Sequence, residues 1–353
     1  MDCAFLVPLD LPGPSGGTGY DMAVIGALNR AGHAVEVIRV PGAWPRPTEA
    51  DRASLLRALA GHPLAVVDGI LALAAPEAIR AATSKGGRVH ILVHSLLTAD
   101  HGLAEEERAR FAASERDALA AATSCSVASR WSATDVATRC PGVLPQIASP
   151  GTSTSPLSRG SDPPHLLVLA ALTPVKNQIH ALRALGRVMD LPWTLGLVGS
   201  DALDPAYVER VREVIARDVD PGRVTLHGAL TGQALDTVWD RTDLLLLTST
   251  SETFGMVVTE ALARGIPAVV TANTGATEAL LGPGCPPGTI PAATAWPGAV
   301  VDAADPQDLS EVLRRWLSDR DLRVAWRTAA LARRPRLQTW EQTAAQLATI
   351  LRT

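Results

Sequence analysis

The sequence has very little lysine, few aromatic side chains and no long apolar run. Only Lys85 and Lys176 are lysines among 32 basic residues, and aromatic residues make up 4% of the 353-residue chain. No apolar stretch approaches the roughly 18 residues that a membrane-spanning helix needs, and Asp2 stands where a secretion signal would be basic. We therefore expect a cytoplasmic protein without stable membrane insertion.

The residue patterns typical of metal sites are also absent. The cysteines Cys3, Cys125, Cys140 and Cys285 form no CxxC pair, which is typical of reduced thiols. Because neither an HxxxH spacing nor a DxD cluster occurs, we expect no metal and no cofactor. The 32 basic and 36 acidic residues nearly balance, and we expect no nucleic-acid partner.

Short apolar runs alternate with helical periodicity along the whole chain. This alternation predicts a parallel α/β sheet in each half, hence two Rossmann-like domains in tandem. Residues 150–164, rich in Gly, Pro, Ser and Thr, indicate a linker between the halves. The predicted strands are 3–7, 34–40, 64–68, 89–94, 124–129 and 146–148, then 165–171, 194–199, 224–227, 243–248, 267–271 and 299–301.

The strongest functional signal is the segment 248–262, with the sequence TSTSETFGMVVTEAL. It follows a predicted strand and enters a predicted helix. Free backbone N–H groups around Phe254, Gly255 and Met256 favour an anion at the start of that helix. Because glycine has no side chain, a diphosphate can approach the backbone closely there. We therefore expect an anionic ligand.

Two glutamates in this segment, Glu252 and Glu260, are eight residues apart. On a helix this spacing corresponds to about 12 Å, which suits the two ends of a nucleotide sugar. Glu252 would then hold hydroxyls of the sugar, and Glu260 would hold the ribose diol. The alternative is structural: Glu252 interacts with the helix dipole, and Glu260 pairs with Arg264 on a solvated face. The spacing alone favours neither.

Lys176 follows a predicted strand, and His94 ends another. Lys176 would place an ammonium where a departing diphosphate needs charge compensation, and the alternative is an ordinary surface lysine. The side chain of His94 would point towards a cleft rather than into the sheet, and the alternative is a core or capping histidine. The glycines in Gly16-Gly17-Thr18-Gly19-Tyr20 indicate a loop before a helix, although a glycine cluster alone is often a plain turn.

Taken together, these motifs resemble the family 4 retaining glycosyltransferases of the GT-B fold. The resemblance rests on the glycine-rich segment 16–20, on Val93-His94, on the stretch 172–176 (LTPVK) and on the E-x7-E pair followed by residues 261–267 and 274–278. It implies an acceptor domain at 1–153, a linker at 154–164 and a donor domain at 165–337. Residues 338–353, with a helix from 340 to 351, would return to the first domain.

The resemblance also implies roles for individual residues. The enzyme would use a nucleoside-diphosphate sugar as co-substrate and a small-molecule or glycan acceptor, without a metal. Where related enzymes commonly carry Gly-Arg as part of the phosphate site, this chain has Ala170-Ala171, and Arg130 is a candidate substitute. The implied catalytic residues are Glu252, His94 and Lys176, and the implied donor-binding residues are Gly16, Gly17, Thr253, Phe254, Gly255, Met256, Val257 and Glu260.

Candidate contacts to the acceptor are Asp68 and Arg130, which lie at the ends of predicted strands in the first half, and Tyr20 of the glycine-rich segment. For Asp68, a buried turn residue is the structural alternative. Two other functions stay open at this point. One is a nucleotide-sugar epimerase or hydrolase of the same fold, which needs no acceptor, and the other is a non-catalytic nucleotide-sugar-binding protein.

Overall fold

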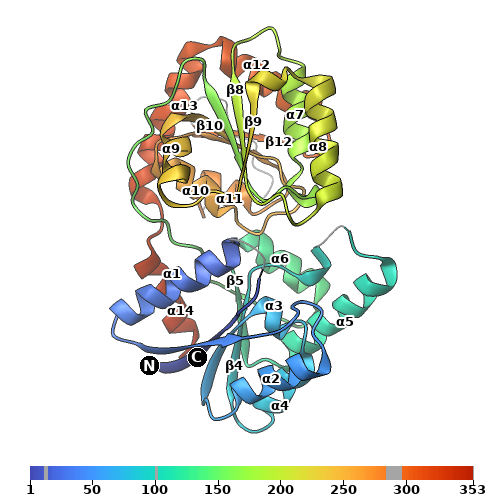
Figure 1. Cartoon of the computed structure of the whole chain (residues 1–353). Coiled ribbons are helices and arrows are strands. Elements are labelled where there is room, and N and C mark those ends of the chain that lie inside the picture. Colours follow the sequence, from blue (N-terminus) through green and yellow to red (C-terminus); the bar gives the residue numbers. More distant parts are fainter. Residues whose placement is uncertain (12–14, 100–101, 284–295, 353) are drawn as a thin grey trace. The chain divides into compact units, whose positions relative to one another are not determined.

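The computed structural model consists of two compact units, each with its own parallel sheet and hydrophobic core (Figure 1). Unit 1 contains Met1–Gly151 and Gln338–Thr353, and unit 2 contains Thr152–Leu337. The prediction for Cys285 lies outside the described residues. The structure describes the whole chain except residues 12–14, 100–101, 284–295 and 353.

The sheet of unit 1 has six parallel strands: β1 (Asp2–Pro8), β2 (Ala34–Val40), β3 (Leu64–Asp68), β4 (Arg88–Val93), β5 (Ser124–Val127) and β6 (Gln146–Ile147). Their order across the sheet is β2-β1-β3-β4-β5-β6. β1 and β3 are buried along almost their whole length, as expected for parallel strands with helices on both faces.

The chain returns to unit 1 at its end, where α14 (Trp340–Ile350) packs against α1 (Gly16–Arg30). The Tyr20 and Trp340 rings meet edge to face at 5.4 Å between centroids, and the Thr343 hydroxyl donates to the Ser149 carbonyl at 2.8 Å. The helices of unit 1 are α1 (Gly16–Arg30), α2 (Glu49–Leu59), α3 (Gly69–Ala72), α4 (Pro76–Thr83), η1 (Leu97–Ala99), α5 (Glu105–Ala121), α6 (Arg130–Arg139) and α14 (Trp340–Ile350).

The sheet of unit 2 also has six parallel strands: β7 (His165–Leu169), β8 (Thr194–Val198), β9 (Val224–Gly228), β10 (Thr242–Leu247), β11 (Ala268–Thr271) and β12 (Gly298–Val301). Their order is β12-β11-β10-β7-β8-β9. The observed strands confirm the two predicted parallel α/β halves. Part of the predicted linker packs on unit 2, because the buried Ser158 hydroxyl donates to the Thr242 carbonyl at 2.7 Å.

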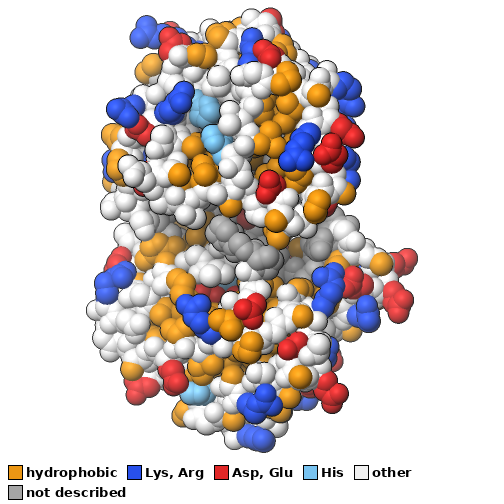
Figure 2. All heavy atoms as spheres, in the orientation of Figure 1, with side chains coloured by type: hydrophobic (Ala, Val, Ile, Leu, Met, Phe, Trp, Pro, Cys, Tyr) orange, Lys and Arg blue, Asp and Glu red, His pale blue; other side chains and the backbone are white. Residues whose placement is uncertain are grey.

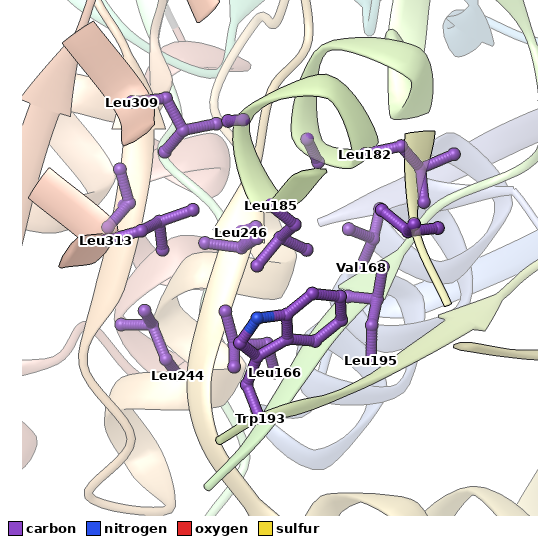
Figure 3. Packing of buried hydrophobic residues seen from close by; sticks show 14 of the residues in the cluster. Leu166, Val168, Leu182, Leu185, Trp193, Leu195, Leu244, Leu246, Leu309 and Leu313 are labelled. Atoms are coloured by element: carbon purple, nitrogen blue, oxygen red, sulfur yellow. The ribbon is translucent and has the colours of Figure 1, made fainter. Parts of the chain in front are cut away.

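The core of unit 2 surrounds Trp193, which is 1% exposed. Figure 3 shows its indole among leucines of the central strands, and Leu309 and Leu313 of α12 (Pro306–Ser318) belong to the same cluster. The indole nitrogen donates to the Val188 carbonyl at 3.1 Å, so its polar group is satisfied. The helices are η2 (Pro174–Lys176), α7 (Gln178–Gly186), α8 (Pro205–Asp218), η3 (Pro221–Arg223), α9 (Gly232–Arg241), α10 (Met256–Ala263), α11 (Ala276–Leu281), α12 (Pro306–Ser318), α13 (Arg320–Arg333) and η4 (Arg334–Arg336).

Each sheet has one point where the strand order reverses direction. In unit 1 this point lies between β1 and β3, and in unit 2 it lies between β7 and β10. In open parallel sheets, ligands bind at the carboxyl ends of the strands beside such a switch point. The segments that follow these four strands are therefore the first places to look for a site.

Charged side chains of both signs are interspersed over the face of each unit drawn in Figure 2. This distribution agrees with the small formal charge of −4. Within the part of the chain that the structure describes, no helix combines the length and the apolar composition needed to cross a bilayer.

Candidate functional site

Lys176 and Glu252 meet at the switch point of unit 2. Lys176 ends η2, which follows β7, and Glu252 follows β10. The Lys176 ammonium nitrogen lies 2.7 Å from Oε2 of Glu252. The side chains are 28% and 13% exposed, respectively, so both are partly withdrawn from water. The structure thus joins two residues that the sequence places 76 positions apart.

Backbone and hydroxyl hydrogen bonds hold these two segments together. The Thr250 amide donates to the Val175 carbonyl at 2.9 Å, and the Thr248 hydroxyl donates to the Asn177 carbonyl at 3.0 Å. The Gly275 amide donates to the Glu252 carbonyl at 2.7 Å. A side chain at Gly275 would overlap the Thr253 carbonyl, because its Cβ would lie 2.1 Å from that oxygen. The segments that carry Lys176 and Glu252 are therefore hydrogen-bonded to each other and tightly packed.

The helix that follows Glu252 begins as the sequence predicts. Gly255 precedes α10 with a φ of +85°, a conformation that favours glycine. A side chain there would also meet Leu247 Cδ2 at 2.9 Å. Phe254 is 8% exposed, which identifies it as an anchor of the turn, whereas Met256 and Val257 in the first turn are partly exposed. The N-terminus of α10 attracts anions through its backbone dipoles.

Glu260 lies within α10 and is partly buried. Burial raises the pKa of its carboxyl, an effect that the nearby Arg264 partly offsets. The Arg264 guanidinium donates to the Glu260 backbone carbonyl at 3.0 Å and stacks 4.7 Å over the Trp239 ring. No ion pair between the Glu260 carboxylate and Arg264 is present among the described residues. The structural alternative considered for Glu260 was an ion pair with Arg264 on a solvated face. The structure does not contain that ion pair among the described residues.

A second cluster lies at the switch point of unit 1. His94 follows β4, and its Nε2 lies 2.8 Å from Oδ1 of Asp21 in α1. Asp68 ends β3, and its Oδ1 accepts the Ile70 amide at 2.8 Å. The side chains of Asp21 and His94 are 0% and 19% exposed, and Asp68 is 3% exposed. Only His94 of the three is substantially accessible from outside.

The pKa values of Asp68 and His94 in this cluster are shifted from those of isolated side chains. Burial, followed by the neighbouring Asp21 carboxylate, raises the pKa of Asp68 to about 7. Burial lowers the pKa of His94, but the carboxylates of Asp21 and Asp68 outweigh it and raise that pKa to about 9. The two carboxylates therefore favour the imidazolium form of His94, in which both ring nitrogens donate hydrogen bonds.

The glycines expected in a loop before the first helix belong to the helix itself. α1 begins at Gly16, and its N-cap is Ser15, whose hydroxyl accepts the Thr18 amide at 3.1 Å. The prediction of a loop was therefore wrong, because a serine cap starts the helix four residues before Tyr20. A Cβ on Gly17 would lie 2.9 Å from the His94 ring, whereas one on Gly16 would meet nothing within 4 Å.

The three predicted acceptor contacts have different surroundings. Tyr20 is 2% exposed, and its hydroxyl donates to the Ala148 carbonyl at 2.9 Å. Its ring instead meets His94 edge-on at 5.2 Å, so Tyr20 supports His94 rather than offering its hydroxyl to a ligand. Asp68 caps α3 and adjoins His94. Arg130 is exposed in the first turn of α6.

Asp21 is a residue that the sequence reasoning missed. It shares a helix face with Val24, Ile25 and Leu28, all of which are buried. Asp21 lies three, four and seven residues before these apolar positions. This helical spacing, which places an acid on the apolar face, is the signal that could have revealed it. One donor atom from each of Asp21, Asp68 and His94 lies within 4.8 Å of the others, so these residues are also a donor set that could hold a cation.

The sequence comparison identifies the family. Residues 154–333 match the family described as glycosyl transferases group 1, a region that covers most of unit 2 and includes Lys176, Glu252 and Glu260. The chain therefore belongs to the glycosyl transferases of group 1. This membership confirms the assignment to the glycosyltransferases that the sequence motifs predicted.

Individual relatives agree with this class. The chain is 28% identical over 190 residues to a D-inositol 3-phosphate glycosyltransferase from Corynebacterium urealyticum, a match that covers 54% of this chain and 39% of the relative. Its fold is similar to that of sucrose-phosphate synthase from Thermosynechococcus elongatus, with a TM-score of 0.80, 18% identity, and 99% and 98% of the two chains covered.

Another similar structure is that of Anabaena HepE in complex with UDP-glucose. The TM-score is 0.76 at 18% identity, and the match covers 100% of this chain and 99% of that one. Together with the two parallel sheets, these similarities confirm the GT-B fold class. The subclass, the individual site residues and the absence of a metal requirement stay predictions.

Proposed function

We propose that this chain is a family 4 glycosyltransferase that transfers a sugar from a nucleoside-diphosphate sugar to a hydroxyl acceptor, with retention of anomeric configuration and without a metal ion. The observation that carries the proposal is the pairing of Lys176 with Glu252 beside the N-terminus of α10. An ammonium, a carboxylate and a helix N-terminus at one switch point supply what an activated sugar needs: charge compensation for its diphosphate and acceptors for its hydroxyls.

Each of these groups has a distinct task in the proposal. The ammonium of Lys176 has three N–H donors, so it can keep its contact with Glu252 and still donate to the β-phosphate. Glu252 accepts hydrogen bonds from hydroxyls of the transferred sugar. Glu260 accepts from the ribose diol, and the first-turn amides of α10 face the diphosphate. Thr253, Phe254, Met256 and Val257 form the wall of this site.

The chemical step exchanges one bond at the anomeric carbon for another. The bond from that carbon to the β-phosphate oxygen breaks, and the bond to the acceptor oxygen forms on the same face of the sugar. The acceptor's proton passes to the departing phosphate oxygen, so no enzyme nucleophile is required. Lys176 and the helix dipole stabilise the negative charge that develops on the diphosphate.

The environment of His94 indicates what this residue can do in the proposed reaction. An imidazolium would not stabilise a positively charged sugar ring, because the two charges repel. It does donate hydrogen bonds to sugar hydroxyls or to phosphate oxygens. We therefore assign His94 to hydrogen-bond donation in the proposed reaction, with the exposed Arg130 as the candidate contact to the acceptor, because Asp68 is buried.

The relatives suggest the substrates with which to begin. Because HepE was captured with UDP-glucose, UDP-glucose is the first donor to test. The curated relative is named for D-inositol 3-phosphate, so inositol phosphates are the first acceptors. Soluble substrates of this kind fit the proposed cytoplasmic location.

Donor turnover with and without acceptor is the direct experiment. UDP-glucose, GDP-glucose and ADP-glucose are each incubated with the chain, with inositol 3-phosphate present or omitted and with or without EDTA. Acceptor-dependent release of nucleotide, unaffected by EDTA, with an α-linked product in the NMR spectrum supports the proposal. A β-linked product contradicts retention. An altered nucleotide sugar without acceptor indicates an epimerase, and saturable binding without turnover indicates a binding protein.

A further inference from the structure

The buried cluster at the switch point of unit 1 contains two carboxyl groups, although one carboxylate is enough to pair with His94. Asp21 Oδ1 is paired with His94 Nε2 at 2.8 Å. Its other oxygen, Oδ2, is buried and has no hydrogen-bond donor among the described residues. Asp68 approaches from the end of β3, so that two carboxyl groups adjoin one imidazole. An unpaired carboxylate oxygen in such a place is unfavourable unless a proton is shared with it.

We propose that Asp21 is a positioning residue for His94, and that Asp21 and Asp68 share one proton, so that His94 is held as an imidazolium with Nδ1–H directed to the substrate. The inference rests on the proposed function, because it assigns a state to the histidine of that site. Two adjacent carboxyl groups away from water do not both ionise readily, and a proton between them satisfies the buried Asp21 Oδ2.

The charged groups around His94 support this arrangement. Asp21 and Asp68 are the ionisable side chains that act on its pKa within the described residues. Tyr20 of α1 faces the ring edge-on, and because burial raises the pKa of its hydroxyl, Tyr20 stays neutral. Gly17 lies against the ring and carries no charge. The two acids therefore govern the protonation of His94.

This state has a consequence for the chemistry. With Nε2–H donated to Asp21, Nδ1 is the nitrogen left for a ligand, and in an imidazolium it carries a proton. His94 then donates a hydrogen bond to a sugar or phosphate oxygen and does not accept the acceptor's proton. That role agrees with a reaction in which the departing phosphate takes this proton.

A divalent cation among the same three donors is the competing explanation. The direct Asp21–His94 hydrogen bond is against it, because Asp21 Oδ1 and His94 Nε2 are already bound to each other at 2.8 Å. Manganese separates the explanations, since a bound paramagnetic ion broadens the NMR signals of the ring next to it.

The test is the titration of the His94 ring by NMR in the full chain without substrate, with the signal assigned through His94→Gln. We expect a pKa of about 9 in the wild type, well above the ordinary value of about 6.5. Asp21→Asn keeps a hydrogen-bond acceptor but removes the carboxylate in direct contact with the ring, and should lower the titration far below the wild-type value, because burial is then opposed by the Asp68 carboxylate alone. Asp68→Asn should leave it above the ordinary value, because the Asp21 carboxylate remains.

Asp51→Asn is the matched control, because Asp51 is a half-buried acid of unit 1 that lies in the α2 capping box and does not act on His94, so the His94 titration should be unchanged. A wild-type His94 that titrates near 6.5 overturns the inference, and this measurement needs no variant to fold. An unshifted Asp21→Asn titration, or broadening by micromolar Mn²⁺, overturns it as well. Conversely, a titration near 9 in a chain that transfers no sugar rejects the proposed function while the inference stands.

The pH profile of sugar transfer links the protonation state of His94 to the proposed function. If the imidazolium is needed, kcat should fall above about pH 9 in the wild type, and in Asp21→Asn this fall should move to lower pH by more than two units. KM for the acceptor should change less, because Asp21 does not touch it. A purely structural role for Asp21 would lower the activity equally at every pH, which contradicts the inference.

Discussion

The ammonium of Lys176 lies 2.7 Å from the carboxylate of Glu252, although the two residues come from segments that follow different strands. Lys176 is one of only two lysines in the chain. Its position at the switch point of unit 2 suits a compact, strongly hydrated charge that can rotate towards a phosphate. The pair therefore combines the two interactions that an activated sugar requires.

Removal of either charge of this pair should reduce transfer while the fold is kept. Glu252→Gln keeps the shape of the side chain but weakens its hydrogen bonds to sugar hydroxyls, and Lys176→Gln removes the charge opposite the diphosphate. We expect each to lower kcat/KM about 10²-fold, measured by nucleotide release. The control is Lys85→Gln, which removes the other lysine from an exposed turn. Near-native turnover of Glu252→Gln would contradict the assigned sugar contact.

The role of Glu260 can be separated from that of Glu252 through the donor. If its carboxylate binds the ribose diol, Glu260→Ala should raise the donor KM roughly tenfold or more, with a smaller change in kcat. The wild type should bind UDP more tightly than 2′-deoxy-UDP, and the variant should bind both equally. Glu213→Ala, on an exposed face of α8, is the control. Undiminished discrimination in Glu260→Ala would place the ribose elsewhere.

Gly17 should be required because the His94 ring lies against it. In Gly17→Ala, the new Cβ would lie 2.9 Å from the ring, so the imidazole must shift, and a displacement of this size can lower kcat about 10²-fold. Gly19→Ala adds the same group to the same helix where nothing lies within 4 Å. Thermal unfolding should show both variants folded. Equal activities of the two would mean that the ring position does not matter.

The sequence predicts the strands well because buried parallel strands are short, continuous apolar runs between helical segments. It predicts Lys176, Glu252 and His94 as separate candidates, since each follows such a run. Their partners are harder to predict. The contact of Lys176 with Glu252 depends on β7 and β10 being neighbours, and strand order is a tertiary property that no local pattern encodes.

The same reasoning explains the errors in the first half of the chain. The glycine cluster at the start of α1 predicts a loop, although Ser15 is a typical N-cap that indicates where the helix begins. Asp21 was overlooked because an acid on an apolar helix face has no meaning until its partner is known. That partner, His94, is 73 residues away.

The stability of unit 1 should depend on pH through Asp68. Burial and the Asp21 carboxylate raise the pKa of Asp68 to about 7 in the folded chain, against about 3.9 in the unfolded chain. Between these values the folded chain binds more protons, so its stabilisation by the protonated carboxyl is complete below pH 4 and is lost as the pH rises towards 7. Asp68→Asn mimics the protonated acid and lacks this loss.

Urea unfolding of the wild type and of Asp68→Asn at several pH values measures this effect. The free energy of unfolding of the wild type should fall relative to that of Asp68→Asn by up to about 1.4 kcal/mol per pH unit between pH 4 and 7, with no further change above pH 7. A difference that stays constant across this range would mean that Asp68 is ionised throughout and shares no proton with Asp21.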